Sequence, residues 1–250
     1  MPKAVIQFHQ VSYRLSARGI LSNLNLEVRQ GETFVLLGRS GCGKTTTLKL
    51  VNRLIEPKSG EVRVEGRATT SWDPISLRRR IGYVIQEVGL FPHFTVERNI
   101  ALLPSLEKWD TEKTRLRVKE LLTLVGLDPA EFSKRYPSEL SGGQRQRVGV
   151  ARALAVNPPI LLMDEPFGAL DPLTRNEIQE EFKELQERLK KTILFVTHDL
   201  REALLLGDRI GLMKEGQIAV SGTPERLLSS SDPEIVVFMK PLQQMISTRE

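Results

Sequence analysis

Short runs of apolar residues recur along the chain, and polar or amphipathic stretches separate them. A run without polar positions is typical of a strand buried on both faces, because a strand with one wet face alternates apolar and polar residues. Such strands are predicted at residues 33–37, 81–85, 160–163, 192–197 and 209–213. Buried strands that alternate with helices favour a mostly parallel sheet covered by helices on both faces.

Other segments alternate apolar and polar residues with a period of two, which predicts strands with one exposed face. They span residues 4–11, 21–28 and 61–65. A further strand is predicted at 217–220, after the turn at residues 214–216.

Helical spacing dominates between residues 87 and 155, where no strong strand pattern occurs. Asp110 or Thr111 is expected to cap a helix there, and Gly126 to end it. The apolar residues at this spacing are Val118, Leu121, Leu122 and Val125. A second amphipathic helix is predicted by Ile178, Phe182, Leu185 and Leu189. The pattern therefore predicts one α/β domain with a helical insertion.

Composition narrows the class of protein only moderately. The 250 residues are 40% hydrophobic and 27% charged, with a net charge of +5, as in an ordinary soluble domain whose surface mildly favours anionic neighbours. The single cysteine excludes an internal disulfide and suits a reducing compartment. No signal peptide is recognisable, and no apolar run approaches the ~18 residues that a membrane span needs. We expect a cytoplasmic protein.

The most specific stretch lies between the predicted strand 33–37 and a predicted helix, and it reads GRSGCGKTT from Gly38 to Thr46. Glycines let successive backbone N–H groups curl around phosphate oxygens, and the following helix N-terminus adds a favourable dipole. Lys44 is placed to reach the β- and γ-phosphates, and the Thr45 hydroxyl to ligate Mg²⁺. The stretch predicts a nucleoside triphosphate site.

Two further motifs carry acidic and anion-binding groups. The buried strand at 160–163 delivers Asp164 at its carboxyl end, where it can hold Mg²⁺, and the adjacent Glu165 can polarise an attacking water. Residues Leu140–Gln144 read LSGGQ before a helical segment, so a hydroxyl, glycine N–H groups and a helix dipole form a second anion-binding tip. This tip could grip the γ-phosphate of a nucleotide held by another subunit.

Together the motifs resemble the ATP-binding subunit of an ABC transporter, in the family's order and over almost the whole chain. In this resemblance Gly38–Thr46 is the Walker A motif, Leu140–Gln144 the signature and Ile160–Asp164 the Walker B motif. The matching single residues are Tyr13 (adenine stacking), Gln86 (Q-loop), Glu165 (catalytic carboxylate), Asp171 (D-loop) and His198 (switch histidine). Four of these positions have a purely structural alternative. Tyr13 could be a strand aromatic, Gln86 a polar strand end, Asp171 a helix cap and His198 a structural histidine.

The resemblance implies the ABC ATPase fold: a P-loop NTPase core with a mostly parallel sheet, an N-terminal antiparallel β subdomain and an α-helical insertion. The implied ATP-binding domain covers residues 1–230, with core and β subdomain at 1–86 and 156–230, the helical subdomain at 87–155 and a short tail at 231–250.

The resemblance also implies ATP and Mg²⁺ as cofactors. The catalytic residues would be Glu165, His198 and Gln86, and the Mg²⁺ ligands Thr45, Gln86 and Asp164. The nucleotide contacts would be Tyr13, Gly38, Arg39, Ser40, Gly41, Cys42, Gly43, Lys44, Thr45, Thr46, Ser141, Gly142, Gly143, Gln144 and Asp171.

Partners follow from the same resemblance. Two copies would close head to tail around two ATP molecules, on the cytoplasmic face of the membrane. The 87–100 region would dock a transmembrane permease that works with a solute-binding protein, without nucleic acid. The alternative is that its apolar residues Leu90, Phe91 and Phe94 pack inside the helical insertion. The amino-acid sequence of Ile81–Pro104 resembles that of the quaternary-amine uptake subfamily, which transports osmoprotectants such as glycine betaine. Two alternatives stay open: an importer of another solute, such as an amino acid or polyamine, or a non-transport ABC ATPase of DNA repair or translation.

Overall fold

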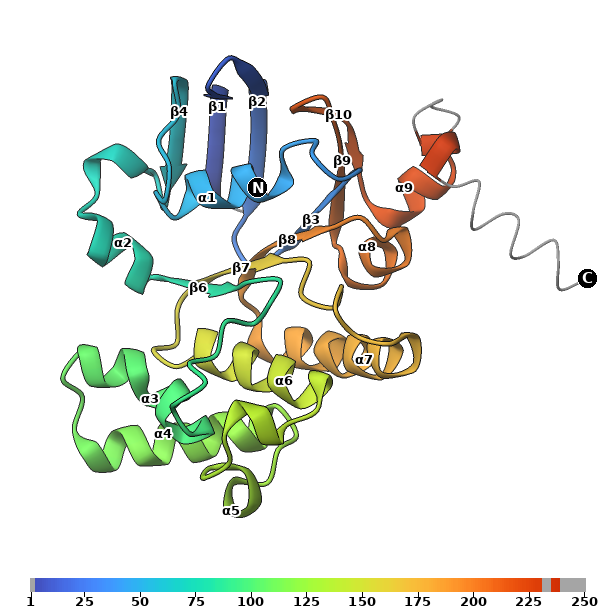
Figure 1. Cartoon of the computed structure of the whole chain (residues 1–250). Helices are drawn as coiled ribbons and strands as arrows, with labels where there is room; N and C mark the ends of the chain where they lie inside the picture. The colour runs from blue at the N-terminus through green and yellow to red at the C-terminus, as the bar shows by residue number, and fades with distance from the viewer. Residues whose placement is uncertain (1–2, 231–234, 239–250) are drawn as a thin grey trace, which may run out of the picture. The chain divides into compact units, whose positions relative to one another are not determined.

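The computed structural model describes residues 3–230 and 235–238. These residues form two compact units (Figure 1). The first unit comprises the chain up to Pro74 and from Thr192 onward, and the second comprises Ile75–Lys191.

An antiparallel sheet opens the first unit, with the strand order β2-β1-β4-β5. Its strands are β1 (Ala4–Leu15), β2 (Arg18–Arg29), β4 (Ser59–Val64) and β5 (Arg67–Ala68). Alternating burial along β2 confirms the predicted one-sided strand. Both β1 and β2 run further than predicted, because their paired hairpin ends are largely exposed and lack an apolar signal.

Mostly parallel strands form the rest of the first unit's sheet structure, in the order β10-β9-β3-β8. The strands are β3 (Thr33–Leu37), β8 (Thr192–Thr197), β9 (Arg209–Lys214) and β10 (Gln217–Gly222). β3 is buried along its whole length and pairs in parallel with β8 and β9, as its unbroken apolar run predicted. The helices of this unit are α1 (Lys44–Val51), the 3₁₀ turn η1 (Thr69–Ser71), α8 (Leu200–Leu206) and α9 (Pro224–Leu228).

The second unit has one parallel strand pair, β6 (Ile81–Val84) with β7 (Ile160–Asp164). After α2 (Pro74–Arg79), its helices are α3 (Val96–Leu106), α4 (Thr111–Leu124), α5 (Pro129–Phe132), η2 (Pro137–Glu139), α6 (Gly142–Ala153) and α7 (Pro172–Leu189). Helices α3, α4 and α6 pack on one another (Figure 1). The predicted strand 81–85 was one residue too long, since Ile85 is exposed and leaves the ladder.

Local capping chemistry explains where α4 begins and ends. The Asp110 carboxylate accepts hydrogen bonds from the N–H groups of Glu112 and Lys113, at 2.8 and 3.1 Å. Gly126 follows the helix with a φ of 70°, a conformation that favours glycine. The predicted cap and stop are therefore confirmed. Within the described parts of the chain, no helix combines the length and the apolar character that crossing a membrane requires.

Candidate functional site

The phosphate loop leaves β3 and enters α1 through left-handed glycines. Gly41 and Gly43 have φ values of 80° and 112°, which L side chains rarely adopt. Lys44 is buried, and its ammonium donates to the carbonyl oxygens of Gly38 and Arg39 at 2.7 and 3.2 Å. The chain thus holds the cation over the loop, at the start of α1, where an anion would gain most from the helix dipole.

A cavity of about 620 Å³ borders this loop, within the range of small-ligand sites. Its lining includes Arg39–Cys42 of the loop, Arg18–Ile20 of the β1–β2 hairpin, and Val237 and Phe238. Loop residues with exposed side chains are Arg39, Ser40 and Thr45. The loop therefore presents polar and cationic groups at an open face.

His198 and the phosphate loop emerge at the same sheet edge. β3 and β8 are parallel, and Leu37 pairs with Thr197, so Gly38 and His198 each follow a paired residue. The Thr197 hydroxyl donates to buried Glu202 at 2.5 Å and accepts from the Asp199 N–H at 2.9 Å. These bonds fix the turn that leaves the His198 side chain exposed. Sequence reasoning missed Glu202, since an acidic residue in a helix usually lies at the surface.

Tyr13, the third predicted residue of the first unit, lies half-buried on β1 and pairs with Leu21 of β2. Tyr13 is therefore a strand aromatic, as the structural alternative proposed, and part of its ring is accessible to solvent.

In the second unit, β7 carries Asp164 at its carboxyl end, with a side chain only 6% exposed. Glu165 follows in the left-handed region, with a φ of 44°. The backbone turns sharply there, so the two carboxylates leave the strand in different directions.

Tyr83 of β6 reaches the same place, which sequence reasoning did not foresee. Its hydroxyl donates to Asp164 Oδ2 at 3.4 Å. Burial, followed by the negative charge of Asp164 and this hydrogen bond, raises the pKa of Tyr83 well above its ordinary value. The phenol therefore stays protonated and acts as a donor.

The predicted anion-binding tip folds as a capping box at the start of α6. The Ser141 hydroxyl accepts from the Gln144 N–H at 3.2 Å, while Gln144 Oε1 accepts from the Ser141 N–H at 2.9 Å. The Gln144 side chain is thus used within the cap in this structure. Gly143 is close-packed, because an added Cβ would lie 3.0 Å from the Thr174 methyl group of α7.

Gln86 lies near the Walker B strand end, within the same unit. It is exposed after β6, and its amide nitrogen is 3.9 Å from where a Cβ on Gly168 would stand. The carbonyls of Val88 and Gly89 accept hydrogen bonds from Arg152 of α6 at 2.6 and 2.7 Å. Burial lowers the pKa of Arg152, because the charged guanidinium loses hydration. The two hydrogen bonds offset this desolvation cost. Helix α6 therefore holds the segment that follows Gln86.

Asp171 caps α7, as the structural alternative expected. Its carboxylate accepts from the Thr174 N–H at 3.1 Å, and hydrogen bonding by Thr174 lowers the pKa of the Asp171 carboxyl. The side chain of the next residue but one, Leu173, is 78% exposed.

Comparison with known proteins places this arrangement in one family. A family model described as ABC transporter matches residues 21–168, more than half of the chain. The chain belongs to the ABC transporter family. Its phosphate loop and most of its second unit, including Gln86, the signature and Asp164–Glu165, lie inside the matched range.

Similar members of the ABC family carry transport names. The glycine betaine/carnitine/choline transport ATP-binding protein OpuCA of Bacillus subtilis (strain 168) is 51% identical over 98% of this chain and 64% of its own length. The choline transport ATP-binding protein OpuBA of the same strain is 55% identical, over 86% of this chain and 56% of its own. The chain thus spans between 56% and 64% of the length of these two relatives.

Solved structures of ABC cassettes share the fold. The post-hydrolysis dimer of the cassette MJ0796, bound to ADP and Pi, matches with a TM-score of 0.76 and 36% identity over 88% of this chain and 98% of that one. CbiO1 from Clostridium perfringens, part of the transporter complex cbiONQ, matches with a TM-score of 0.83 and 27% identity over 97% of each chain. These matches confirm the predicted ABC ATPase fold.

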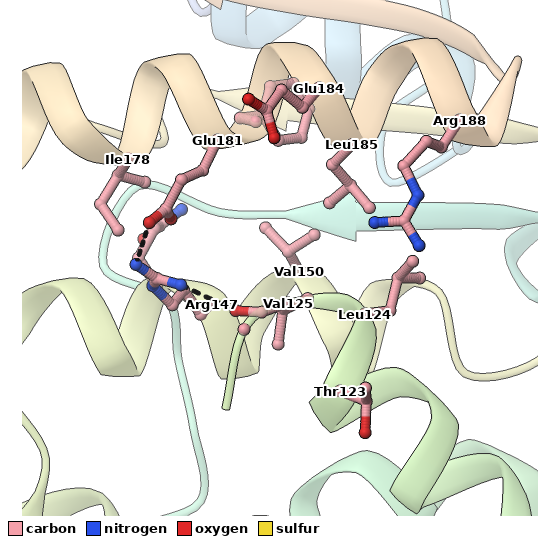
Figure 2. Close-up of a pocket in the computed structure, with 13 residues that line it drawn as sticks. Thr123, Leu124, Val125, Arg147, Val150, Ile178, Glu181, Glu184, Leu185 and Arg188 are labelled. Carbon is pink, nitrogen blue, oxygen red and sulfur yellow. Dashed lines mark hydrogen bonds and ion pairs between the residues drawn. The ribbon is translucent and has the colours of Figure 1, made fainter. Parts of the chain in front are cut away.

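Beside its nucleotide motifs, this ABC chain has a pocket of about 250 Å³ within the second unit, between α7, α6 and the end of α4 (Figure 2). Arg147 of α6 bridges one end: its guanidinium donates to the Val125 carbonyl at 3.0 Å and to Glu181 Oε1 at 2.6 Å (Figure 2). Three helical segments of the unit are thereby joined by one side chain.

We expect Arg147→Met to lower the free energy of unfolding by about 1–3 kcal/mol, because the substitution leaves a part-buried carbonyl and Glu181 without this donor. Arg115→Met is the matched control, since Arg115 pairs with Glu112 on the exposed face of α4 and such pairs contribute at most about 0.5 kcal/mol. Urea unfolding of both variants measures the difference. Equal losses would contradict the bridging role.

Proposed function

We propose that this chain is the ATP-hydrolysing subunit of an ABC importer for a quaternary-amine osmoprotectant such as glycine betaine. The observation that carries the proposal is the 51% identity, over 98% of the chain, to a relative named for glycine betaine, carnitine and choline transport. The ATP chemistry rests on the phosphate loop and the two carboxylates, which the chain retains.

Each half of the chain contributes its own groups to the proposed reaction. Backbone N–H groups of the loop and the Lys44 ammonium bind the phosphates, and His198 orients the γ-phosphate end. Glu165 accepts a proton from the attacking water. The sharp backbone turn at Glu165, directly after β7, directs its carboxylate away from that of Asp164.

Mg²⁺ fits the donor set. The described residues hold no group of three or more His, Cys, Asp or Glu side chains suited to a metal. Mg²⁺ in phosphoryl-transfer sites needs no such cage, since one carboxylate, one hydroxyl and phosphate oxygens suffice with water. Thr45 and Asp164 would hold the ion, with Gln86 as a further oxygen ligand. When bound, the ion neutralises charge that develops on the phosphate oxygens.

A second copy supplies the remaining phosphate contacts in this proposal. At the start of α6, Ser141 is exposed, Gly142 is half-buried and Gly143 is buried. The helix is 12 residues long, so its N-terminus carries the dipole of a full helix. The similar cassette MJ0796 forms a dimer with ADP and Pi in its post-hydrolysis state. We infer that this chain also closes as a homodimer around ATP, with Asp171 at the subunit interface.

The docking site for a permease is proposed at residues 87–100. Phe91, His93 and Phe94 form an aromatic cluster, with ring centroids 4.6 to 6.1 Å apart, and the Phe91 side chain is 41% exposed. Arg98 stacks on Phe94 at 4.1 Å. A rigid, half-exposed aromatic surface suits a partner helix and the peripheral, cytoplasmic-face location that the importer requires.

Asn99 makes this surface rigid. It is fully buried, its Oδ1 accepts from the Phe91 N–H at 2.8 Å, and its Nδ2 donates to the carbonyls of Phe91, Phe94 and Thr95. One side chain thus satisfies four backbone groups of the loop, which sequence reasoning did not foresee.

Uptake by proteoliposomes tests the proposal. The chain is reconstituted with candidate permease and solute-binding subunits from its own organism, ATP is enclosed, and uptake of radiolabelled glycine betaine, glutamine and putrescine is compared. The proposal predicts ATP-dependent uptake of glycine betaine alone. Uptake of glutamine or putrescine would favour the other-solute alternative, and ATPase activity that nucleic acid stimulates would favour the DNA-repair or translation alternative.

A further inference from the structure

A tyrosine that no motif includes lies against the proposed metal-binding carboxylate. β6 and β7 are parallel, and Tyr83 pairs with Leu162. Side chains two residues apart share a face of a sheet, so Asp164 lies diagonally from Tyr83 on the same face. A tyrosine is long enough to span such a diagonal, and its hydroxyl is 3.4 Å from Asp164 Oδ2.

Gly82, the residue before Tyr83, shows that the face of β6 opposite the Tyr83 side chain has no room for a side chain. Gly82 faces the C-terminal end of α6, where an added Cβ would lie 2.5 Å from the Ala153 carbonyl oxygen. That face is closed by backbone. Because successive residues of a strand alternate, Tyr83 points to the opposite face, toward the carboxylate. The packing of one face thus determines the orientation of the phenol on the other.

The hydroxyl group acts on a single carboxylate oxygen. Tyr83 is half-buried and Asp164 is 6% exposed, so water competes little for this contact. By donating to Oδ2, the phenol restricts rotation of the Asp164 carboxyl group. Carboxylates that ligate metals are commonly oriented in this way, and loss of the orienting group typically weakens metal binding by about 10- to 100-fold.

We propose that Tyr83 is a positioning residue for the metal of the ATP site, which it orients through Asp164. The inference rests on the proposed function, because it requires that Asp164 bind the Mg²⁺ that accompanies ATP. Tyr83 itself touches neither metal nor nucleotide in this proposal.

The test is Tyr83→Phe, which keeps the ring and removes only the hydroxyl. Mn²⁺ serves as the spectroscopic probe, and its dissociation constant is measured by electron paramagnetic resonance with excess protein and ADP. We expect about 10-fold weaker Mn²⁺ binding, with an unchanged ADP dissociation constant in EDTA. The Mg²⁺ concentration for half-maximal ATPase should rise by about the same factor, while the rate at saturating Mg²⁺ changes less than about two-fold.

Tyr136→Phe is the matched control, because Tyr136 lies at the surface of the same unit, 45% exposed, and it should match the unsubstituted chain in every assay. Tyr83→Phe with unchanged Mn²⁺ binding would overturn the inference. The inference would also be overturned if Tyr83→Phe weakened ADP binding equally with the metal present and in EDTA. That result would indicate a merely structural role for Tyr83. If the unsubstituted chain bound no Mn²⁺ with ADP, the proposed function itself would fail.

Discussion

Glu165→Gln should lower ATP turnover by about 100- to 10,000-fold, because the amide cannot accept the proton of the attacking water. ATP binding should persist, since the phosphate loop and Asp164 are unchanged. The substitution keeps the shape of the side chain, so the left-handed turn at residue 165 should be retained. Phosphate release measures turnover, and a fluorescent ATP analogue measures binding.

Glu187→Gln is the control for this substitution, because Glu187 lies on the exposed face of α7 and should keep full turnover. If Glu165→Gln kept normal turnover, another residue would have to act as the base. If it lost ATP binding instead, Glu165 would be a structural rather than a catalytic group.

Gly38→Ala should weaken nucleotide binding by about 10- to 100-fold, although the change adds only a methyl group. The added Cβ would lie 2.6 Å from the Met213 carbonyl oxygen and 2.7 Å from the Cys42 sulfur. The backbone oxygen of β9 cannot yield, so the start of the loop must move, and overpacking of this kind costs about 1–3 kcal/mol. Isothermal titration with ATP measures the loss.

Gly19→Ala provides the comparison, because a Cβ at that position meets nothing within 4 Å. It adds the same methyl group beside the same cavity and should bind ATP normally. A Gly38→Ala variant that bound ATP as tightly as Gly19→Ala would show that the close approach to β9 does not shape the loop.

Much of the fold could be predicted because apolar runs report burial directly. The strands β3 and β8 begin and end where the sequence predicts, and Asp110 and Gly126 carry local signals for the ends of α4. The hairpin of β1 and β2 was underestimated, because exposed residues in a paired strand resemble a loop.

The phosphate loop could be predicted because consecutive residues of the sequence supply its phosphate-binding groups. The contacts of Tyr83, Glu202 and Asn99 could not, since each depends on which segments fold side by side. Tyr83 meets Asp164 only through the register of two strands that lie about eighty residues apart in the chain. For Gln144 the motif could be recognised from the sequence, but the hydrogen bond of its side chain could not. The Gln144 side chain accepts from the Ser141 N–H within the helix cap.

The central claim is that ATP lies between the phosphate loop of one copy and the signature of another. A crystal structure of Glu165→Gln with ATP and Mg²⁺ tests it most directly. The account predicts a dimer in which Ser141 of each copy is within hydrogen-bond distance of the γ-phosphate that Lys44 of the other copy binds. A γ-phosphate bound at Lys44 and contacted by Ser141 of neither copy would contradict it.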